Sequence, residues 1–257
     1  RCPERVEPHR RRSQSRHRLF RSVTGAVLEI DGASKDYRAL RPLRIQHLSV
    51  AASESVAIVG LDQAAAEVLV NLATGASLPD AGEVRVFGRA TSAIADADDW
   101  LSVVDRFGIV SGRAVLLDEL TVIQNLAMPF TLDIEPPPPD VRDRATSLAN
   151  EVGLPDSVAQ RRIADLDAAA RLRVRLGRAL ALGPSLLLLE HASAGLSAAD
   201  ATETGRRIRS VAGRRGAAVL ALTVDEGFAR AVADRVLTLE AATGRLRERG
   251  VRKWFRG

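Results

Sequence analysis

The chain has 257 residues, of which 46% are hydrophobic and only 4% aromatic, so an aliphatic core is expected. A single cysteine, Cys2, excludes a disulfide framework, and the four histidines lack metal-ligand spacing, so no metal site is expected. No apolar run approaches the roughly 20 residues that span a bilayer, and the arginine-rich N-terminus lacks a signal peptide's apolar segment. These features predict a soluble intracellular protein that reaches a membrane only through a partner.

The net charge of +5 is distributed unevenly along the chain. Residues 1–25 carry eight arginines and residues 244–257 carry six basic residues, so the part between them is acidic. A nucleic-acid-binding domain has its basic patch on the folded body, which disfavours nucleic acid as a partner here. The basic C-terminal tail, with Trp254 and Phe255, could instead bind an anionic lipid surface.

The pattern of apolar residues predicts short strands that alternate with helices. After an arginine-rich, disordered tail over 1–25, strands are expected at 27–30, 48–50, 55–59 and 82–87, with a helix at 64–73. A short strand at 108–110 leads into a helical insertion over about 111–170, with a helix start at Thr121, an interruption by the prolines of 136–139 and an amphipathic helix over 141–152. The remaining expected elements are a helix at 172–180, a strand at 186–190, a helix at 198–212, a strand at 217–222, a helix at 225–233 and a strand at 235–239.

Short, fully apolar strands between helices are typical of a parallel sheet buried on both faces. The early strands follow one another through turns, which fits an antiparallel patch beside that sheet. The fold class is therefore α/β, with a mostly parallel core sheet, an antiparallel β patch and a helical subdomain. The domain is expected to span 26–244, followed by a basic tail over 245–257.

A strand that ends at Gly60 and leads into a helix is where a phosphate-binding loop would lie. Such a loop follows the pattern G-x-x-x-x-G-K-[ST], whose glycines let backbone amides surround the phosphates while the lysine and hydroxyl bind phosphate and magnesium. Residues 60–67 read Gly-Leu-Asp-Gln-Ala-Ala-Ala-Glu, so only Gly60 fits. This stretch alone does not predict a nucleotide site.

Three other stretches carry a family resemblance: residues 116–129 (Leu-Leu-Asp-Glu-Leu-Thr-Val-Ile-Gln-Asn-Leu-Ala-Met-Pro), 178–184 (Arg-Ala-Leu-Ala-Leu-Gly-Pro) and 234–237 (Asp-Arg-Val-Leu). With Gly82-Glu83-Val84 and the Tyr37 region, the chain resembles the ATP-binding subunits of ABC transporters from about 27 to 247. The resemblance is to the subgroup that serves lipoprotein release, macrolide export and cell division. It implies a P-loop NTPase-like cassette, a membrane permease and a second cassette as hetero- or homodimer partners, and a cytoplasmic position at the inner face of the membrane through the permease.

Most of the family's functional residues are absent when they are placed on this chain by position. The lysine of the phosphate loop falls on Ala66 and the magnesium-binding hydroxyl on Glu67, with Ala65 and Val68 as further degenerate counterparts. The signature peptide Leu-Ser-Gly-Gly-Gln falls on Leu166, Asp167, Ala168, Ala169 and Ala170.

The residues that hydrolyse ATP are replaced in the same way. The glutamine that senses the γ-phosphate falls on Gly112, the glutamate that polarises water on His191 and the switch histidine on Val224. Glu190 occupies the acidic position at the end of the leucine-rich strand. Tyr37 keeps the adenine-stacking aromatic and, with Gly60, is a weak remnant of the nucleotide site.

These replacements have physical consequences for nucleotide binding. Ala66 supplies no cation, and the carboxylates of Asp62 and Glu67 would repel triphosphate oxygens by roughly 1–4 kcal/mol. The same carboxylates suit a helix N-terminus without ligand, so a helix with a side-chain cap is expected from Asp62 onward. Altered residues at the signature would also impair both shared sites of any head-to-tail dimer.

The sequence therefore favours a pseudo-ATPase without catalytic residues or a bound cofactor, serving as a structural or regulatory partner of a permease or an active cassette. One alternative is an unorthodox ATPase that binds ATP and magnesium through Tyr37 and Glu190 and uses His191 as general base. A second alternative is a tail-mediated binder of anionic surfaces or nucleic acid.

Overall fold

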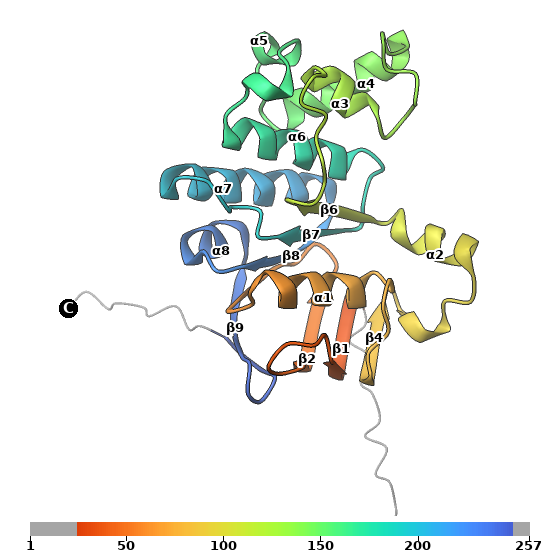
Figure 1. Ribbon diagram of the computed structural model, residues 1–257, viewed down its shortest axis with the longest axis vertical. Helices are drawn as coiled ribbons and strands as arrows, with labels where there is room; N and C mark the ends of the chain where they lie inside the picture. The colour runs from red at the N-terminus through yellow and green to blue at the C-terminus, as the bar shows by residue number, and fades with distance from the viewer. Residues whose placement is uncertain (1–24, 249–257) are drawn as a thin grey trace, which may run out of the picture.

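The computed structural model describes residues 25–248, which form two β-sheets with helices between and beside them (Figure 1). The first sheet is antiparallel, with the strand order β2-β1-β4-β5. Its strands are β1 (Ala26–Lys35), β2 (Leu43–Ala51), β4 (Ala81–Val86) and β5 (Arg89–Ala90). The second sheet has the order β10-β9-β3-β8-β7-β6 and is parallel except for β10. Its strands are β3 (Ser55–Val59), β6 (Phe107–Ser111), β7 (Leu186–Glu190), β8 (Ala218–Thr223), β9 (Arg235–Glu240) and β10 (Arg245–Glu248).

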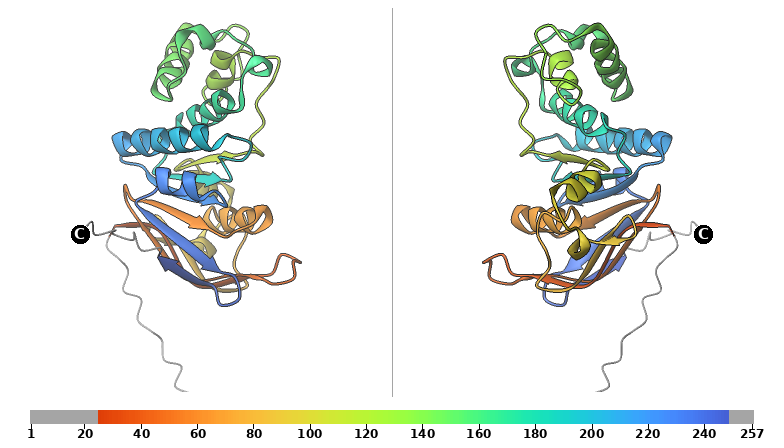
Figure 2. Two further views of the ribbon diagram at one scale, coloured as in Figure 1. Left: turned by 90° about the vertical axis from the view of Figure 1, so that its left-hand side faces the viewer. Right: turned by 90° about the vertical axis from the view of Figure 1, so that its right-hand side faces the viewer.

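The helices fall into two groups. Those that pack on the sheets are α1 (Gln63–Ala73), α2 (Ala97–Val104), α7 (Ala198–Arg215) and α8 (Glu226–Val232). Those that form a layer beyond α7, here called the helical lobe, are α3 (Val122–Ala127), α4 (Pro139–Glu151), α5 (Asp156–Ala159) and α6 (Ala168–Leu180), of which α6 also packs on β6. The lobe lies at one end of the molecule, beyond α7, in all three views (Figures 1 and 2).

Both faces of the central strands β3, β7 and β8 are buried, as the continuous apolar strands predict. On β7, Leu187 and Leu189 pack into the core beneath α6, α7 and α8, whereas Leu186 and Leu188 point into the core that α1 shares with the antiparallel sheet. Because successive side chains of a strand point to opposite faces of the sheet, this one run of leucines contributes to both cores. The expected α/β class, the antiparallel patch and the helical subdomain are confirmed.

The helical lobe is joined to the sheet by a close backbone contact. A Cβ atom added to Gly108 in β6 would lie 2.4 Å from the carbonyl oxygen of Ala179 in α6, so only glycine allows this approach. At the other side of the lobe, α3 begins at the expected cap, Thr121, which forms a capping box with Gln124. The end of α6 is thus fixed by a contact between distant parts of the sequence, whereas the start of α3 is fixed by local sequence.

Several elements differ from the expectation: β5 and α5 were not predicted, β1 and β2 are longer than expected, and three further differences have a clear cause. Helix α2 was not predicted, because its acidic stretch hides the apolar period. Helix α4 begins at Pro139, the last proline of the run expected to interrupt the helices, since proline is tolerated in a first turn. Residues 245–248, expected as the start of the basic tail, instead form β10, whose ladder runs from Arg245 beside Glu240 to Glu248 beside Leu237.

The arginine-rich segment over 1–24 and residues 249–257, with Trp254 and Phe255, lie outside the described residues. The predictions of terminal disorder and of lipid or nucleic-acid binding by the tail therefore remain predictions. Within residues 25–248, no helix is both long and apolar enough to cross a membrane.

Candidate functional site

The start of α1 occupies the place of the expected phosphate loop. Only Gly60, Leu61 and Asp62 separate β3 from the helix, and Gly60 turns the chain with a φ of 100°. The carboxylate of Asp62 accepts a hydrogen bond from the amide of Ala65 at 2.8 Å. The predicted side-chain cap is thus confirmed, and it uses an amide of the first turn that a bound anion would otherwise need.

The face of α1 that carries the lysine position points into the core. Ala66 is fully buried within the core shared by α1 and the antiparallel sheet, and Ala65 is 7% exposed. A long cationic side chain at Ala66 would therefore meet apolar neighbours in this arrangement. Glu67, one residue further, is half-exposed and points elsewhere.

Glu190 is a buried carboxylate at the end of β7, and its side chain has no exposed surface. Gln63 donates a hydrogen bond from Nε2 to its Oε1 atom. Arg113 donates from Nη2 to its Oε2 atom at 2.5 Å. Both oxygens of the carboxylate that would hold magnesium in an unorthodox ATPase are therefore engaged by this chain's own donors.

Arg113 joins this carboxylate to a second one. Its Nη1 atom lies 2.6 Å from Oε1 of Glu67, so one guanidinium bridges α1 and β7. Planar guanidinium groups are suited to such two-ended contacts. Glu67, Arg113, Glu190 and Gln63 together form what is here called the Arg113 cluster.

The sequence did not single out Arg113 or Gln63 as site residues. Arg113 directly follows Gly112, the counterpart of the glutamine that senses the γ-phosphate, and this adjacency was the only available signal. Gly112 itself contributes no side chain, and a Cβ atom added to it would have no neighbour within 4 Å among the described residues.

Tyr37 lies in the loop after β1, at the edge of the core that contains α1. Burial raises the pKa of its hydroxyl, and the negative charge of Asp62 raises that pKa further. The hydroxyl is therefore protonated at neutral pH. Tyr37 packs against the same core as α1, and its hydroxyl forms no hydrogen bond with the Arg113 cluster within residues 25–248.

His191 follows Glu190 in a strained conformation, with a φ of 44°. Its backbone amide donates to the carbonyl of Leu222 at 2.8 Å, while its Nε2 atom is buried and without a hydrogen-bond partner among the described residues. Val224, the counterpart of the switch histidine, is 64% exposed and carries no titratable group. No pairing of His191 with a carboxylate occurs in the described part, so nothing there orients it as a base.

The counterpart of the signature peptide lies at the start of α6, where an aspartate caps the helix as Asp62 caps α1. The Asp167 carboxylate accepts from the amide of Ala170 at 2.7 Å. Leu166 and Ala170 are buried, whereas Ala168 is exposed and Ala169 half-buried. An aspartate cap therefore stands at both helix starts that the resemblance assigns to phosphate contacts.

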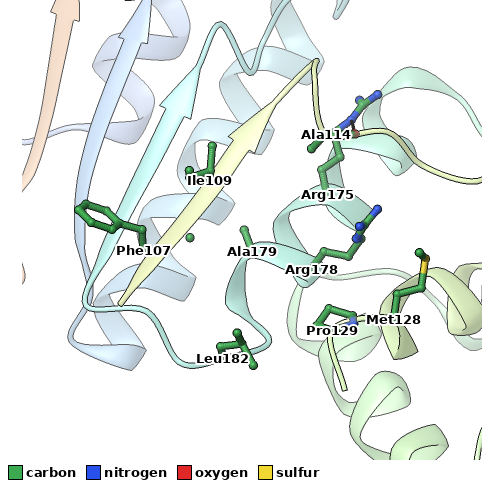
Figure 3. A pocket seen from close by; sticks show the side chains of 10 residues that line it. Phe107, Ile109, Ala114, Met128, Pro129, Arg175, Arg178, Ala179 and Leu182 are labelled. Carbon is green, nitrogen blue, oxygen red and sulfur yellow. Dashed lines mark hydrogen bonds between the residues drawn. The ribbon is translucent and has the colours of Figure 1, made fainter. Parts of the chain in front are cut away.

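A groove of about 370 Å³ runs between β6 and the helical lobe (Figure 3). Apolar side chains of Phe107, Ile109, Met128 and Leu182 line it, together with two arginines. Burial, followed by the charge of a neighbouring arginine, lowers the pKa values of Arg175 and Arg178. Each donates to a carbonyl of the segment after β6, Arg175 to Ala114 and Arg178 to Val115.

No group of three or more His, Cys, Asp or Glu side chains that could hold a metal ion occurs between residues 25 and 248. Glu190 and Glu67 do not fit a magnesium site in this arrangement, because Arg113 already lies between them. A cation there would have to displace the guanidinium.

Comparison with known proteins identifies the family. A family model described as "ABC transporter" matches residues 43–194. The lipoprotein-releasing system ATP-binding protein of Psychrobacter arcticus is 30% identical over 192 residues, which cover 75% of this chain and 84% of that protein. The methionine import ATP-binding protein of Brucella abortus is 30% identical over 219 residues, covering 85% of this chain. The chain spans only 58% of the length of that methionine import protein.

Solved structures agree on the fold. The protein cbiO1 from Clostridium perfringens, part of the ABC transporter complex cbiONQ, superposes with a TM-score of 0.72 at 17% identity, covering 87% of each chain. A dimeric ATP-binding cassette in a post-hydrolysis state with ADP and Pi superposes with a TM-score of 0.68 at 21% identity, covering 87% of this chain and all of that one. The relatives include the expected lipoprotein-release subgroup and also import proteins outside it. The chain therefore belongs to the ABC transporter family and has the fold of its ATP-binding cassettes.

Proposed function

We propose that this chain is an ABC cassette that neither binds nor hydrolyses ATP and serves as a structural or regulatory partner of a membrane permease, of an active cassette, or of both. The observation that carries the proposal is the bridge from Arg113 to Glu67 and Glu190. Phosphoryl transfer depends on cations placed around the phosphate oxygens. Here the cationic side chain is held by carboxylates, and the position of the phosphate-loop lysine is a buried alanine.

Two further features support the loss of nucleotide binding. The aspartate caps at Ala65 and Ala170 place negative charge at both helix starts, where phosphates would need free amides. His191 has no partner among the described residues that would orient it, and a general base needs a bound substrate to act on. An unorthodox ATPase is therefore the weaker candidate.

A partner role is supported by the surface beside the cluster. The groove between β6 and the helical lobe combines apolar side chains with two arginines that form no ion pair among the described residues. Exposed Val115 and Leu182 extend its apolar rim. Such a surface suits contact with another protein subunit, and relatives of this family act in transport systems that contain permease and cassette components.

The decisive test is isothermal titration calorimetry of the full chain with ATP and Mg²⁺. The expected dissociation constant is above the millimolar range, corresponding to binding weaker than about −4 kcal/mol. A combined Gln63→Gly, Ala65→Gly, Ala66→Lys and Glu67→Ser variant should lose helix stability. It should regain affinity only where the start of α1 rearranges, because position 66 points into the core.

Micromolar binding by the unmodified chain would overturn the proposal. ATP turnover that disappears in His191→Ala, and persists in a Ser147→Ala surface control, would establish the unorthodox ATPase instead. Ser147 is exposed on α4 and has no contact with the cluster.

A further inference from the structure

We propose that Arg113 is a latch, whose guanidinium fixes the orientation of the helical lobe against the sheets in the absence of any ligand. It acts through residues 112–117, here called the linker, which connect β6 to the loop before α3. The proposal concerns the chain without nucleotide, so it can be tested independently of the proposed loss of ATP binding.

One side of the linker is tied to the sheet core. The Arg113 side chain reaches Glu67 on α1 at 2.6 Å and Glu190 on β7 at 2.5 Å. The backbone is held as well, because the amide of Arg113 donates to the Ser111 hydroxyl and that of Ala114 to the Ser111 carbonyl. Glu190 is fully buried, so this end of the latch is anchored in the core itself.

The other side of the linker is tied to the helical lobe. Arg175 donates from Nε to the carbonyl of Ala114 at 3.2 Å, and Arg178 donates from Nη1 to that of Val115 at 2.7 Å. Figure 3 shows both arginines projecting from α6 toward this segment, with Arg175 beside Ala114. Fully buried Asn125 of α3 accepts from the amide of Leu117 and donates to its carbonyl. The linker therefore moves with the lobe unless Arg113 holds it to the core.

The contact between Gly108 and Ala179 supplies the pivot. It joins the C-terminal end of α6 to β6 so closely that no side chain fits between them. The rest of the lobe lies farther from the sheet (Figures 1 and 2), so a rotation about this contact would displace it most at α4 and α5. Arg113 opposes that rotation at the start of the linker, directly after β6.

The latch can open without unfolding of the core. The side chain of Arg113 is 44% exposed and that of Glu67 is 43% exposed, so water can replace their contact. The contact with Glu190 is the costly one to release, because it leaves that buried carboxylate with Gln63 as its remaining side-chain donor among the described residues. Loss of this one side chain releases the linker while leaving the pivot and both hydrophobic cores intact. The lobe is expected to sample several orientations once it is released.

The test measures lobe orientation with paired spin labels on the full chain. Cys2 is replaced by serine, and labels are attached at Ala76→Cys, after α1, and Ser147→Cys, on α4, which are both exposed. Without nucleotide, the unlatched variant Arg113→Ala should broaden the distance distribution by about twofold relative to the parent. Hydrogen exchange at the amides of Ala114 and Leu117 should become about tenfold faster.

Arg89→Ala is the control, because Arg89 on β5 makes a bidentate ion pair with Asp99 on α2, away from the linker. It should retain the parent distribution and exchange rates. If Arg113→Ala does not fold, the double variant Arg113→Gln with Glu190→Gln removes the ionic tie without leaving an unpaired buried charge, and should broaden the distribution equally. A folded variant of either kind with the parent's distance distribution would overturn the latch.

Discussion

The carboxylate of Asp62 and the backbone amide of Ala65 form a 2.8 Å hydrogen bond that starts α1 directly after a three-residue turn. Replacing Asp62 by alanine should lower the free energy of unfolding by about 1 kcal/mol, because the amide loses its cap. Asp62→Asn keeps an accepting oxygen and should cost only a few tenths of that. Urea denaturation measures both, and an equal loss in the two variants would contradict the cap.

Ala66 offers a sharper test of the helix orientation. Ala66→Lys should lower the free energy of unfolding by about 3 kcal/mol, because a long charged side chain must enter the core. Ala64→Lys, two residues earlier on the exposed face of α1, should change stability by less than about 0.5 kcal/mol. Similar stabilities for the two variants would show that the lysine position is open.

The contact between Gly108 and Ala179, which forms the pivot beneath the helical lobe, requires a residue without a side chain at position 108. Gly108→Ala should destabilise the chain by about 1–3 kcal/mol, since its Cβ would lie 2.4 Å from a backbone oxygen. Gly112→Ala is the control, because no atom of the described residues lies within 4 Å of the added Cβ. Thermal unfolding should separate the two, and a neutral Gly108→Ala would mean that α6 can shift away.

Glu151 and Arg215 join α4 to α7 through two short hydrogen bonds, at 2.7 and 2.5 Å. The hydrogen bonds from Arg215 hold the pKa of Glu151 below its usual range, against the opposing effect of burial. The lowered pKa means that this pair stabilises the fold above the unfolded-state pKa of about 4.3 and that the stabilisation is lost as the pH falls through the folded-state pKa.

Between pH 7 and pH 3, the parent should therefore lose about 1 kcal/mol more stability than Glu151→Gln. Glu119→Gln is the control, because Glu119 is 85% exposed and its partner Arg162 lies 3.5 Å away. Denaturation at each pH gives the comparison. Parallel pH profiles for the parent and Glu151→Gln would contradict the assignment.

Much of the fold could be predicted from the sequence because its signals are local. The leucine run that becomes β7 and the apolar period that becomes α4 are readable within one window. Helix α2 was missed because Asp96, Asp98 and Asp99 serve as cap and first turn, which lowers the local hydropathy. Strand β10 was missed because its arginines read as a tail, and only pairing with β9 makes it a strand.

For the candidate site too, the features that depend on nearby residues could be predicted, and those that depend on distant residues could not. The Asp62 cap depends on residues three apart, and it could be predicted from helix chemistry alone. The Arg113 cluster could not, since Arg113 and Glu190 are 77 positions apart in the sequence. Only the parallel pairing of β6 with β7 brings the end of one strand beside the end of the other.

Complete burial of Glu190 also constrains how this sequence can change over generations. Loss of Arg113 alone would leave a buried charge beside a single amide, at a cost of about 3–5 kcal/mol, which is a large share of a typical domain's stability. Loss of Arg113 alone is therefore selected against, whereas joint replacement of Arg113 and Glu190 is not. Among descendants of a common ancestor, Arg113 and Glu190 should be retained together or exchanged together.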